Sequence, residues 1–237
     1  MKVIILAAGM GTRLFPITKK THKCLLEVGG KLIIQHQLDA IKSYGDIEVV
    51  VVGGYKIDDL KNHLKDSVTV LDNPRYETTN SIVSLWIAKK ELDDDVIIMN
   101  ADIIFDEMVF RRLAENEDGI CVAISKKWDP KKGYKVQIKG KNIVDMGMNL
   151  APNIIGGEYA GIIKFSKSAA KLLQNILDSF MKENKVTGWF ESAVVKMLKN
   201  GSKANFITVD DYLWHEIDTK DELENTRKIF NKGKMHV

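Results

Sequence analysis

The first 25 residues contain the feature that most constrains this chain: a short apolar run that leads directly into a turn with two glycines. Val3–Ala8 reads VIILAA, and Gly9 and Gly11 follow it. An apolar run of this length, ended by a turn, is typical of a strand buried on both faces of a parallel sheet. Glycine has no Cβ, so the backbone of the turn can approach a ligand closely. The N-terminus therefore predicts a buried strand and a ligand-binding turn.

The residues that follow the glycines indicate that this ligand carries phosphate. Arg13 and Lys23 come just after the turn, and both side-chain types bind phosphate oxygens. Two common phosphate-binding turns are excluded. A dinucleotide-binding G-x-G-x-x-G turn needs glycine where this chain has Leu14, and a P-loop ends in glycine-lysine-serine/threonine where this chain has Gly11-Thr12-Arg13. The turn therefore belongs to a different class.

The length, composition and net charge of the chain indicate a globular protein whose partners are small molecules. With 237 residues, 45% of them apolar, the chain can form one domain with a sizeable core. The net charge of +3 comes without a dense Lys/Arg stripe, so we expect no nucleic-acid partner. Cys24 and Cys121 form neither a disulfide framework nor a C-x-x-C metal motif, and a cytoplasmic location is expected. No apolar run approaches the length of a membrane span, so we expect no membrane insertion.

The first half alternates between strand-like and helix-like segments. We expect further strands at 47–52, 68–71 and 96–99, and helices at 31–44, 58–64 and 80–92. Alternation of this kind favours a parallel sheet with right-handed crossovers. Ligands of such sheets bind at the carboxyl ends of the strands. That edge carries Ala8–Arg13, Gly53-Gly54 and Asn100–Asp102.

The second half is richer in β-structure. We expect strands at 119–125, 134–138, 143–148, 159–165, 204–209 and 214–217, and helices at 168–182, 189–198 and 220–230. The predicted fold class is α/β, with a mostly parallel, doubly wound, Rossmann-like sheet and a β-rich insertion in the second half. Such an insertion is suited to form a second wall of the ligand site.

Two aspartates are candidates for holding a metal ion. Asp102 directly follows the strand at 96–99, and Asp218 follows Glu216 by the two-residue period that puts both on one face of a strand. Carboxylates at this edge suit Mg²⁺, which prefers oxygen ligands and substrate phosphates. Each aspartate has a structural alternative, because it could cap a helix that begins near Asp106 or at Lys220. The residues alone leave both alternatives open.

The motif L-A-A-G-M-G-T-R-L, followed by the lysine of T-H-K-C-L, resembles the nucleotidyltransferases that join an NTP to a small phosphorylated compound. Sugar-phosphate nucleotidyltransferases and phosphocholine cytidylyltransferases belong to this group, and the chain is most similar to the phosphocholine type. Many relatives have proline before the lysine, where this chain has His22. Similar stretches continue along nearly the whole chain, at residues 53–55, 76–82, 157–162, 189–191 and 216–218.

The resemblance implies a Mg²⁺-dependent cytidylyltransferase that transfers CMP from CTP to a small phosphomonoester similar to phosphocholine, and releases pyrophosphate. It implies that Asp102 and Asp218 hold the magnesium, that Arg13 neutralises the leaving pyrophosphate and that Lys23 stabilises charge at the reacting phosphates. It implies a role in making precursors of cell-surface polysaccharides. The nucleotide-binding residues that it implies are Leu6, Ala7, Ala8, Gly9, Gly11, Thr12, Gly54, Tyr55, Asn80, Ser81 and Ala101.

The predicted organisation is a single domain, residues 1–237, in which 1–118 mainly bind the nucleotide and 119–237 mainly bind the acceptor. Aromatic faces near carboxylates can hold a quaternary ammonium by cation–π attraction, although core packing is the usual role of aromatics. The aromatic candidates are Trp128, Tyr159, Trp189 and Trp214, and the carboxylates are Glu158, Glu191 and Glu216. Lysines that could face the acceptor phosphate are Lys126, Lys127 and Lys135.

The sequence is compatible with other acceptors, and other functions have to be weighed against it. A phosphosugar or a phosphorylated amino-acid derivative could replace phosphocholine as the acceptor. A glycosyltransferase usually has D-x-D where this chain has Asp102-Ile103-Ile104, and a nicotinamide-dependent oxidoreductase needs the missing third glycine. A non-catalytic nucleotide-binding module would be expected to lack one of the charges on Arg13, Lys23, Asp102 and Asp218, all of which are present. The sequence leaves the oligomeric state open.

Overall fold

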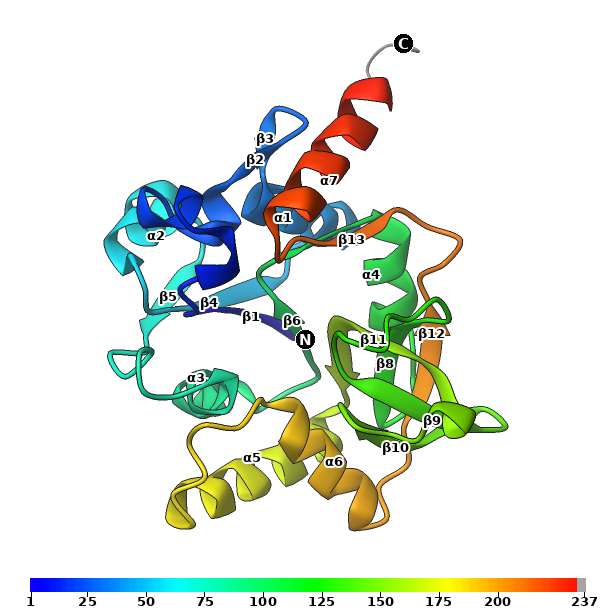
Figure 1. The fold of residues 1–237 in the computed structure, drawn as a ribbon. Helices are drawn as coiled ribbons and strands as arrows, with labels where there is room; N and C mark the ends of the chain where they lie inside the picture. The colour runs from blue at the N-terminus through cyan, green and yellow to red at the C-terminus, as the bar shows by residue number, and fades with distance from the viewer. Residues whose placement is uncertain (234–237) are drawn as a thin grey trace.

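A central sheet organises the molecule, which a computed structural model describes for residues 1–233 (Figure 1). Its nine strands are β1 (Lys2–Ala7), β4 (Glu48–Gly53), β5 (Thr69–Asp72), β6 (Val96–Asn100), β8 (Ile120–Ser125), β9 (Lys135–Lys139), β10 (Asn142–Gly147), β11 (Ile155–Phe165) and β12 (Asn205–Thr208). The main path runs β10-β9-β11-β6-β1-β4-β5, while β8 pairs with β11 and β12 pairs with β8. Two short antiparallel pairs lie outside this sheet: β2 (Glu27–Val28) with β3 (Lys31–Leu32), and β7 (Ile103–Phe105) with β13 (Trp214–Glu216).

The strands β6, β1, β4 and β5 form the parallel part of the sheet, and the inner three, β6, β1 and β4, are buried on both faces. In β1, Val3 and Ile5 pack on one face while Ile4 packs on the other, and all three are fully buried. Alternate residues of a strand point to opposite faces, so an unbroken apolar run requires helices on both sides. The predicted α/β class with a parallel central sheet is confirmed.

Helices cover both faces of this sheet (Figure 1). The helices are α1 (Ile33–Tyr44), α2 (Ile57–Leu64), α3 (Ser81–Ile87), α4 (Glu107–Ala114), α5 (Lys167–Lys182), α6 (Glu191–Lys199) and α7 (Lys220–Gly233). Helices α1, α2 and α4 contribute to one core cluster, and α3, α5 and α6 contribute to the cluster on the opposite face. A third, smaller cluster joins α7 to the β2–β3 region through Leu223, Val28 and Leu26. None of the helices within residues 1–233 is long and apolar enough to cross a membrane.

The β-rich second half continues the central sheet instead of forming a separate insertion. Strand β11 pairs antiparallel with β6, and β8 and β9 then pair with β11. The pairing of β11 with β8 shifts register between Tyr159 and Ile163, around Gly161 with φ of 84°. This left-handed backbone favours glycine, and a Cβ there would lie 3.1 Å from Ile103 Cγ2. With this shift, the long strand β11 pairs with β6, β8 and β9.

Some element boundaries differ from the prediction. The helix expected at 80–92 ends at Ile87, and a 3₁₀ turn follows at Lys89–Glu91. The strand expected at 159–165 begins four residues earlier, at Ile155. Strand β7 was not predicted, because three residues are too few to show a periodic pattern. Helix α4 entered the prediction only as a segment beginning near Asp106 that Asp102 could cap, and its eight residues give a short pattern.

Candidate active site

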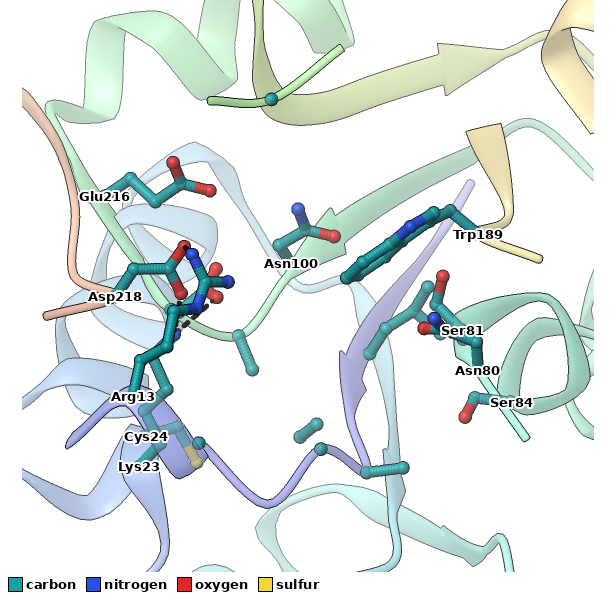
Figure 2. A pocket seen from close by; sticks show the side chains of 18 of the residues that line it. Arg13, Lys23, Cys24, Asn80, Ser81, Ser84, Asn100, Trp189, Glu216 and Asp218 are labelled. Carbon is teal, nitrogen blue, oxygen red and sulfur yellow. Dashed lines mark hydrogen bonds and ion pairs between the residues drawn. The ribbon is translucent and has the colours of Figure 1, made fainter. Parts of the chain in front are cut away.

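A cavity of about 390 Å³ lies at the carboxyl ends of β1 and β6. The register places Leu6 opposite Asn100 and Ala7 opposite Gly53, so the three central strands end at the same level. Most of the predicted site residues line this cavity: Leu6, Ala7, Ala8, Gly9, Gly11, Thr12, Arg13, Lys23, Asn80, Ser81, Ala101, Asp102, Tyr159, Trp189, Glu191, Glu216 and Asp218. Charged side chains gather on one side of it and polar ones on the other (Figure 2).

The glycine turn after β1 forms part of the cavity wall. Gly11 has φ of 60°, and a Cβ there would lie 3.2 Å from the Cβ of Lys23 and 3.3 Å from Thr18 Cγ2. The Thr18 hydroxyl donates to the Gly11 carbonyl oxygen at 2.8 Å, and the Leu14 amide donates to the same oxygen at 3.0 Å. The backbone amides of residues 9–13 come before Leu14 in the chain, whose amide donates the first backbone hydrogen bond of the turn. Such amides can bind an anion.

A cluster of two cations and two carboxylates stands beside the turn (Figure 2). Lys23 Nζ donates to Asp102 Oδ2 at 2.8 Å and to Asp218 Oδ1 at 2.6 Å. Arg13 Nη1 lies 2.7 Å from Asp218 Oδ2. Burial opposes the charge on Lys23, but Asp102 and Asp218 outweigh it and raise the lysine pKa above its ordinary value. Lys23 therefore remains a buried cation in this site.

The pairing of β7 with β13 brings the late aspartate to the early one. Glu216 lies opposite Ile103, and the Ile217 amide donates to the Asp102 carbonyl oxygen at 2.9 Å. Glu216 ends β13 and Asp218 follows it two residues later, beyond the strand, and both line the cavity. Burial, followed by the charges of Asp102 and Asp218, raises the pKa of Glu216 to about 8.

Helix capping does not account for Asp102 or Asp218, because other residues do it. Asp106 caps α4 by accepting from the Met108 amide at 2.8 Å. At α7, Thr219 Oγ1 accepts from the Glu222 amide at 3.3 Å, and Glu222 Oε2 accepts from the amides of Asp218 and Thr219 at 2.8 Å each. This reciprocal arrangement is a capping box. The capping alternatives for the two aspartates are therefore wrong.

The donor set of the cluster fits magnesium. Asp102 Oδ1 is buried and has no hydrogen-bond partner among residues 1–233, so one carboxylate oxygen is left for a ligand. Within residues 1–233, no group of three or more His, Cys, Asp and Glu side chains could hold a metal. Two carboxylates alone suit Mg²⁺, which completes its coordination with water and substrate phosphates.

His22 holds the segment that carries Lys23, a role that the sequence analysis missed. Its ring is buried, with Nε2 2.8 Å from the Ala7 carbonyl oxygen and Nδ1 3.2 Å from the Cys24 amide nitrogen. A carbonyl only accepts and an amide only donates, so Nε2 carries the proton and the ring is neutral. Burial lowers the pKa of His22 to about 4. The position directly before Lys23 was the one available signal for this role.

The opposite wall of the cavity is polar and is built by the start of α3 and the segment before α6. Asn80 Oδ1 accepts from the Ser81 amide at 2.8 Å, and Ser81 Oγ accepts from the Phe190 amide at 2.9 Å. The Asn80 amide donates to the Val186 carbonyl oxygen at 3.0 Å. Trp189, 44% exposed, extends over this wall (Figure 2). Polar lining residues that the sequence analysis did not single out for the site are Asn73, Tyr76, Thr79, Ser84 and Asn100.

Five predicted site residues do not line the cavity, and two of them support the glycine turn. Gly54 packs behind the turn, where a Cβ would lie 2.7 Å from the Cβ of Tyr76 and 3.0 Å from the Ala8 carbonyl oxygen. The Tyr55 amide donates to the Ala8 carbonyl oxygen at 3.1 Å, and its hydroxyl donates to the Thr18 carbonyl oxygen at 3.1 Å. Both residues therefore support the glycine turn from behind.

The other three residues, Lys126, Lys135 and Glu158, were expected to bind the acceptor. Lys135 and Glu158 form a buried ion pair of 3.1 Å, and Glu158 Oε2 accepts from the Asp129 amide at 3.0 Å. Lys135 Nζ also donates to the carbonyl oxygens of Lys132 and Gly133. The pair thus braces the loop at residues 129–133, whose own residues 131–133 line the cavity. The Lys126 amide bonds to Asp210, and its side chain is exposed outside the cavity.

Only part of the expected aromatic set reaches the cavity. Tyr159 and Trp189 line it, whereas Trp128 and Trp214 do not. The Trp214 indole donates to the Ala160 carbonyl oxygen at 2.8 Å, so this tryptophan supports β11. A complete aromatic cage made of the four expected residues is therefore not present in this structure.

Comparisons with known proteins identify the family to which the chain belongs. Residues 3–179 match the family model of the MobA-like NTP transferase domain. A CTP:phosphoglutamine cytidylyltransferase from Campylobacter jejuni is 30% identical over 249 residues, which cover 94% of this chain and 98% of that protein. A choline-phosphate cytidylyltransferase from Streptococcus pneumoniae is 37% identical over 111 residues, which cover 46% of this chain and 48% of that protein.

The fold also has a solved counterpart. The structure of an inositol-1-phosphate CTP transferase from T. maritima superposes with a TM-score of 0.83 at 21% identity, and covers 98% of this chain and 95% of that one. With the family match over most of its length and relatives among the cytidylyltransferases, the chain belongs to the MobA-like NTP transferase family and is a nucleotidyltransferase close to the phosphocholine-type cytidylyltransferases.

Proposed function

We propose that this protein is a Mg²⁺-dependent cytidylyltransferase that transfers CMP from CTP to a small phosphomonoester and releases pyrophosphate. The observation that carries the proposal is the cluster of Arg13, Lys23, Asp102 and Asp218 beside the glycine turn. CTP as the donor is supported by the names of two relatives, a CTP:phosphoglutamine and a choline-phosphate cytidylyltransferase. Their acceptors differ from each other, so the acceptor here is inferred only as a small phosphomonoester, with phosphocholine, a phosphorylated amino-acid derivative and a phosphosugar as candidates.

The two sides of the cavity suggest the orientation of CTP. The amides of residues 9–13 and the Arg13 guanidinium would bind the triphosphate, because both are donors on the charged side. Asn80, Ser81 and the polar side chains next to them would face the base and ribose from the opposite wall (Figure 2). The α-phosphate would then lie between the walls, near Lys23.

The chemistry needed is the attack of an acceptor phosphate oxygen on the α-phosphorus. A new P–O bond forms, the bond from the α-phosphorus to the bridging oxygen breaks, and pyrophosphate leaves with that electron pair. A phosphomonoester has a second pKa of about 6, so it is mostly dianionic at pH 7 and needs no general base. Positioning and charge stabilisation would therefore be the main tasks of the protein.

The charged residues have separate tasks in this reaction. Lys23 would stabilise the charge that builds up at the reacting phosphates, and Arg13 would neutralise the departing pyrophosphate. Asp102 and Asp218 would hold Mg²⁺, which would supply positive charge to the bound phosphates. Because Lys23 bonds to both aspartates in this structure, arriving phosphates would compete with these carboxylates for the ammonium.

A pyrophosphate-release screen tests the proposal. CTP, UTP, ATP and GTP are each incubated with Mg²⁺ and with a panel containing phosphocholine, phosphoethanolamine, phosphorylated amino-acid derivatives and hexose 1-phosphates. We expect release with CTP that depends on the presence of one acceptor class. CTP binding without release for any acceptor would instead indicate a non-catalytic nucleotide-binding module.

A further inference from the structure

We propose that the acceptor carries a primary ammonium group whose N–H hydrogens bond to the Tyr159 hydroxyl and the Glu191 carboxylate, so that the cavity prefers this group over a quaternary ammonium. This inference rests on the proposed function, because it names the acceptor class of the same cavity. It differs from the expectation of an aromatic cage around a trimethylammonium.

Two buried polar atoms in the cavity wall have no hydrogen-bond partner within the described part of the protein: the Tyr159 hydroxyl oxygen and Glu191 Oε2. Tyr159 is 7% exposed and Glu191 is 4% exposed, and both line the cavity. Buried polar groups in proteins are nearly always hydrogen-bonded, so an unpaired hydroxyl and an unpaired carboxylate in one wall need an explanation. A ligand that donates hydrogen bonds to both would supply one.

The backbone around these two side chains fixes their positions. The Tyr159 amide donates to the Tyr134 carbonyl oxygen at 2.8 Å, and the Tyr159 ring packs edge-on against Phe190, with centroids 6.3 Å apart. The Phe190 amide in turn donates a hydrogen bond to Ser81 Oγ at the start of α3. Glu191 follows directly and begins α6. The unpaired groups therefore belong to a framework of strand and helix.

The carboxyl groups of the wall favour a cation over a neutral donor. Burial, with a smaller contribution from the charge of Asp102, raises the pKa of Glu191 to about 8. With this pKa, Glu191 is mostly uncharged at pH 7 as long as it lacks a positive partner, because burial disfavours the carboxylate. A bound ammonium would stabilise the ionised carboxylate and lower the pKa again. Glu216 reaches the same cavity from β13 and adds a second carboxyl group.

A quaternary ammonium fits these groups poorly. It has no N–H hydrogen, so it would cover Tyr159 and Glu191 without bonding to either of them, and buried groups left unpaired in this way weaken binding strongly. Its usual partners are aromatic faces. Trp189 offers such a face here, but Trp128 and Trp214 lie outside the cavity.

The test uses four acceptors of equal charge and chain length: phosphoethanolamine, its N-methyl and N,N-dimethyl derivatives, and phosphocholine. They carry three, two, one and no N–H hydrogens. Binding is measured by isothermal titration to the protein saturated with Mg²⁺ and α,β-methylene-CTP. We expect the affinity to fall along the series, by at least tenfold from first to last. 2-Hydroxyethyl phosphate, which has an uncharged hydroxyl in place of the ammonium, should also bind more weakly than phosphoethanolamine.

Variants assign the effect to the two residues. Tyr159→Phe and Glu191→Gln should each reduce the fall in affinity from phosphoethanolamine to phosphocholine, while α,β-methylene-CTP still binds. The second variant keeps the test valid if the first does not fold. Tyr134→Phe is the matched control, because the Tyr134 hydroxyl already lies 3.3 Å from Ser192 Oγ. This control should show the same fall in affinity along the four acceptors as the unmodified protein.

The possible failures are distinguishable. Equal or tighter binding of phosphocholine than of phosphoethanolamine overturns the inference and leaves nucleotidyl transfer standing. So does a protein that binds the CTP analogue but none of the four acceptors. If the unmodified protein does not bind α,β-methylene-CTP, that result contradicts the proposed function itself.

Discussion

The His22 ring is hydrogen-bonded to the Ala7 carbonyl oxygen, 2.8 Å from Nε2, at the point where β1 ends and the glycine turn begins. This bond joins the two segments that meet at the charged cluster, because Lys23 directly follows His22. A buried, neutral imidazole therefore fixes the position of a buried, charged lysine.

His22 should make the stability of the fold depend on pH. Its pKa is lowered by burial from the ordinary 6.5 to about 4, so the unfolded chain binds a proton before the folded one does. The stabilisation is fully present above pH 6.5 and is lost as the pH falls through 4, by about 3 kcal/mol in total. Urea unfolding at pH 7 and pH 5 measures part of this loss.

From pH 7 to pH 5, the free energy of unfolding of the unmodified protein should fall by about 2 kcal/mol more than that of the His22→Gln variant. Glutamine keeps a donor for Ala7 but does not titrate. His63→Gln is the control, since His63 is exposed and should leave the loss unchanged. Identical losses in the unmodified protein and in His22→Gln would show that His22 is not the titrating group.

Lys23 should be essential for turnover. The Lys23→Ala variant is expected to lower kcat by 10²–10³, the range seen when a charge-stabilising donor is removed from an active site. Pyrophosphate release with CTP and the best acceptor measures this effect, and a thermal melt checks the fold. Lys20→Ala, which removes an exposed lysine three residues away, should retain full activity. Comparable rates for both variants would place Lys23 outside the reaction.

The two aspartates should be required for metal binding. Asp102→Asn and Asp218→Asn should each remove most turnover, and excess EDTA should abolish it in the unmodified protein. Mn²⁺ binding in the presence of α,β-methylene-CTP, followed by electron paramagnetic resonance, gives a second readout that does not need catalysis. Asp221→Asn, an exposed change at the start of α7, should behave like the unmodified protein. Full activity in EDTA would contradict the metal assignment.

The Lys135–Glu158 pair should contribute to stability through the loop it braces. Lys135→Met leaves the Glu158 carboxylate buried without its cation, a change that typically costs about 3–5 kcal/mol. Replacing both residues, with Glu158→Gln as the second change, should cost less than the sum of the single variants. A urea double-mutant cycle measures this coupling. Strictly additive effects would mean that the 3.1 Å ion pair seen here has no energetic role.

The parts of the site that were predictable from the sequence lie at the ends of buried strands. Val3–Ala8 and the glycines after it predicted a phosphate-binding turn at the carboxyl edge, and Asp102 was placed there by the strand before it. Asp218 was found from the two-residue period and from the resemblance. The structure brings Asp102 and Asp218 to one lysine through β7, a three-residue strand too short to be recognised.

The acceptor side was less predictable, because it depends on loop geometry and on register shifts. Whether Lys135 or Lys132 faces the cavity is decided by the turn at residues 129–133 and by an irregularity between Ile155 and Gly157 in β11. A periodic pattern cannot locate such a shift. His22 escaped notice for another reason: its partner, Ala7, is a backbone carbonyl that no sequence motif marks.

The most direct test of cytidylyl transfer is ³¹P nuclear magnetic resonance of the protein with CTP, Mg²⁺ and phosphoethanolamine. The account predicts that the acceptor monoester resonance and the CTP resonances decline together, while pyrophosphate and a new diphosphate diester appear in equal amounts. Pyrophosphate that accumulates with CMP while the acceptor resonance stays constant would contradict transfer, because it would show hydrolysis of CTP.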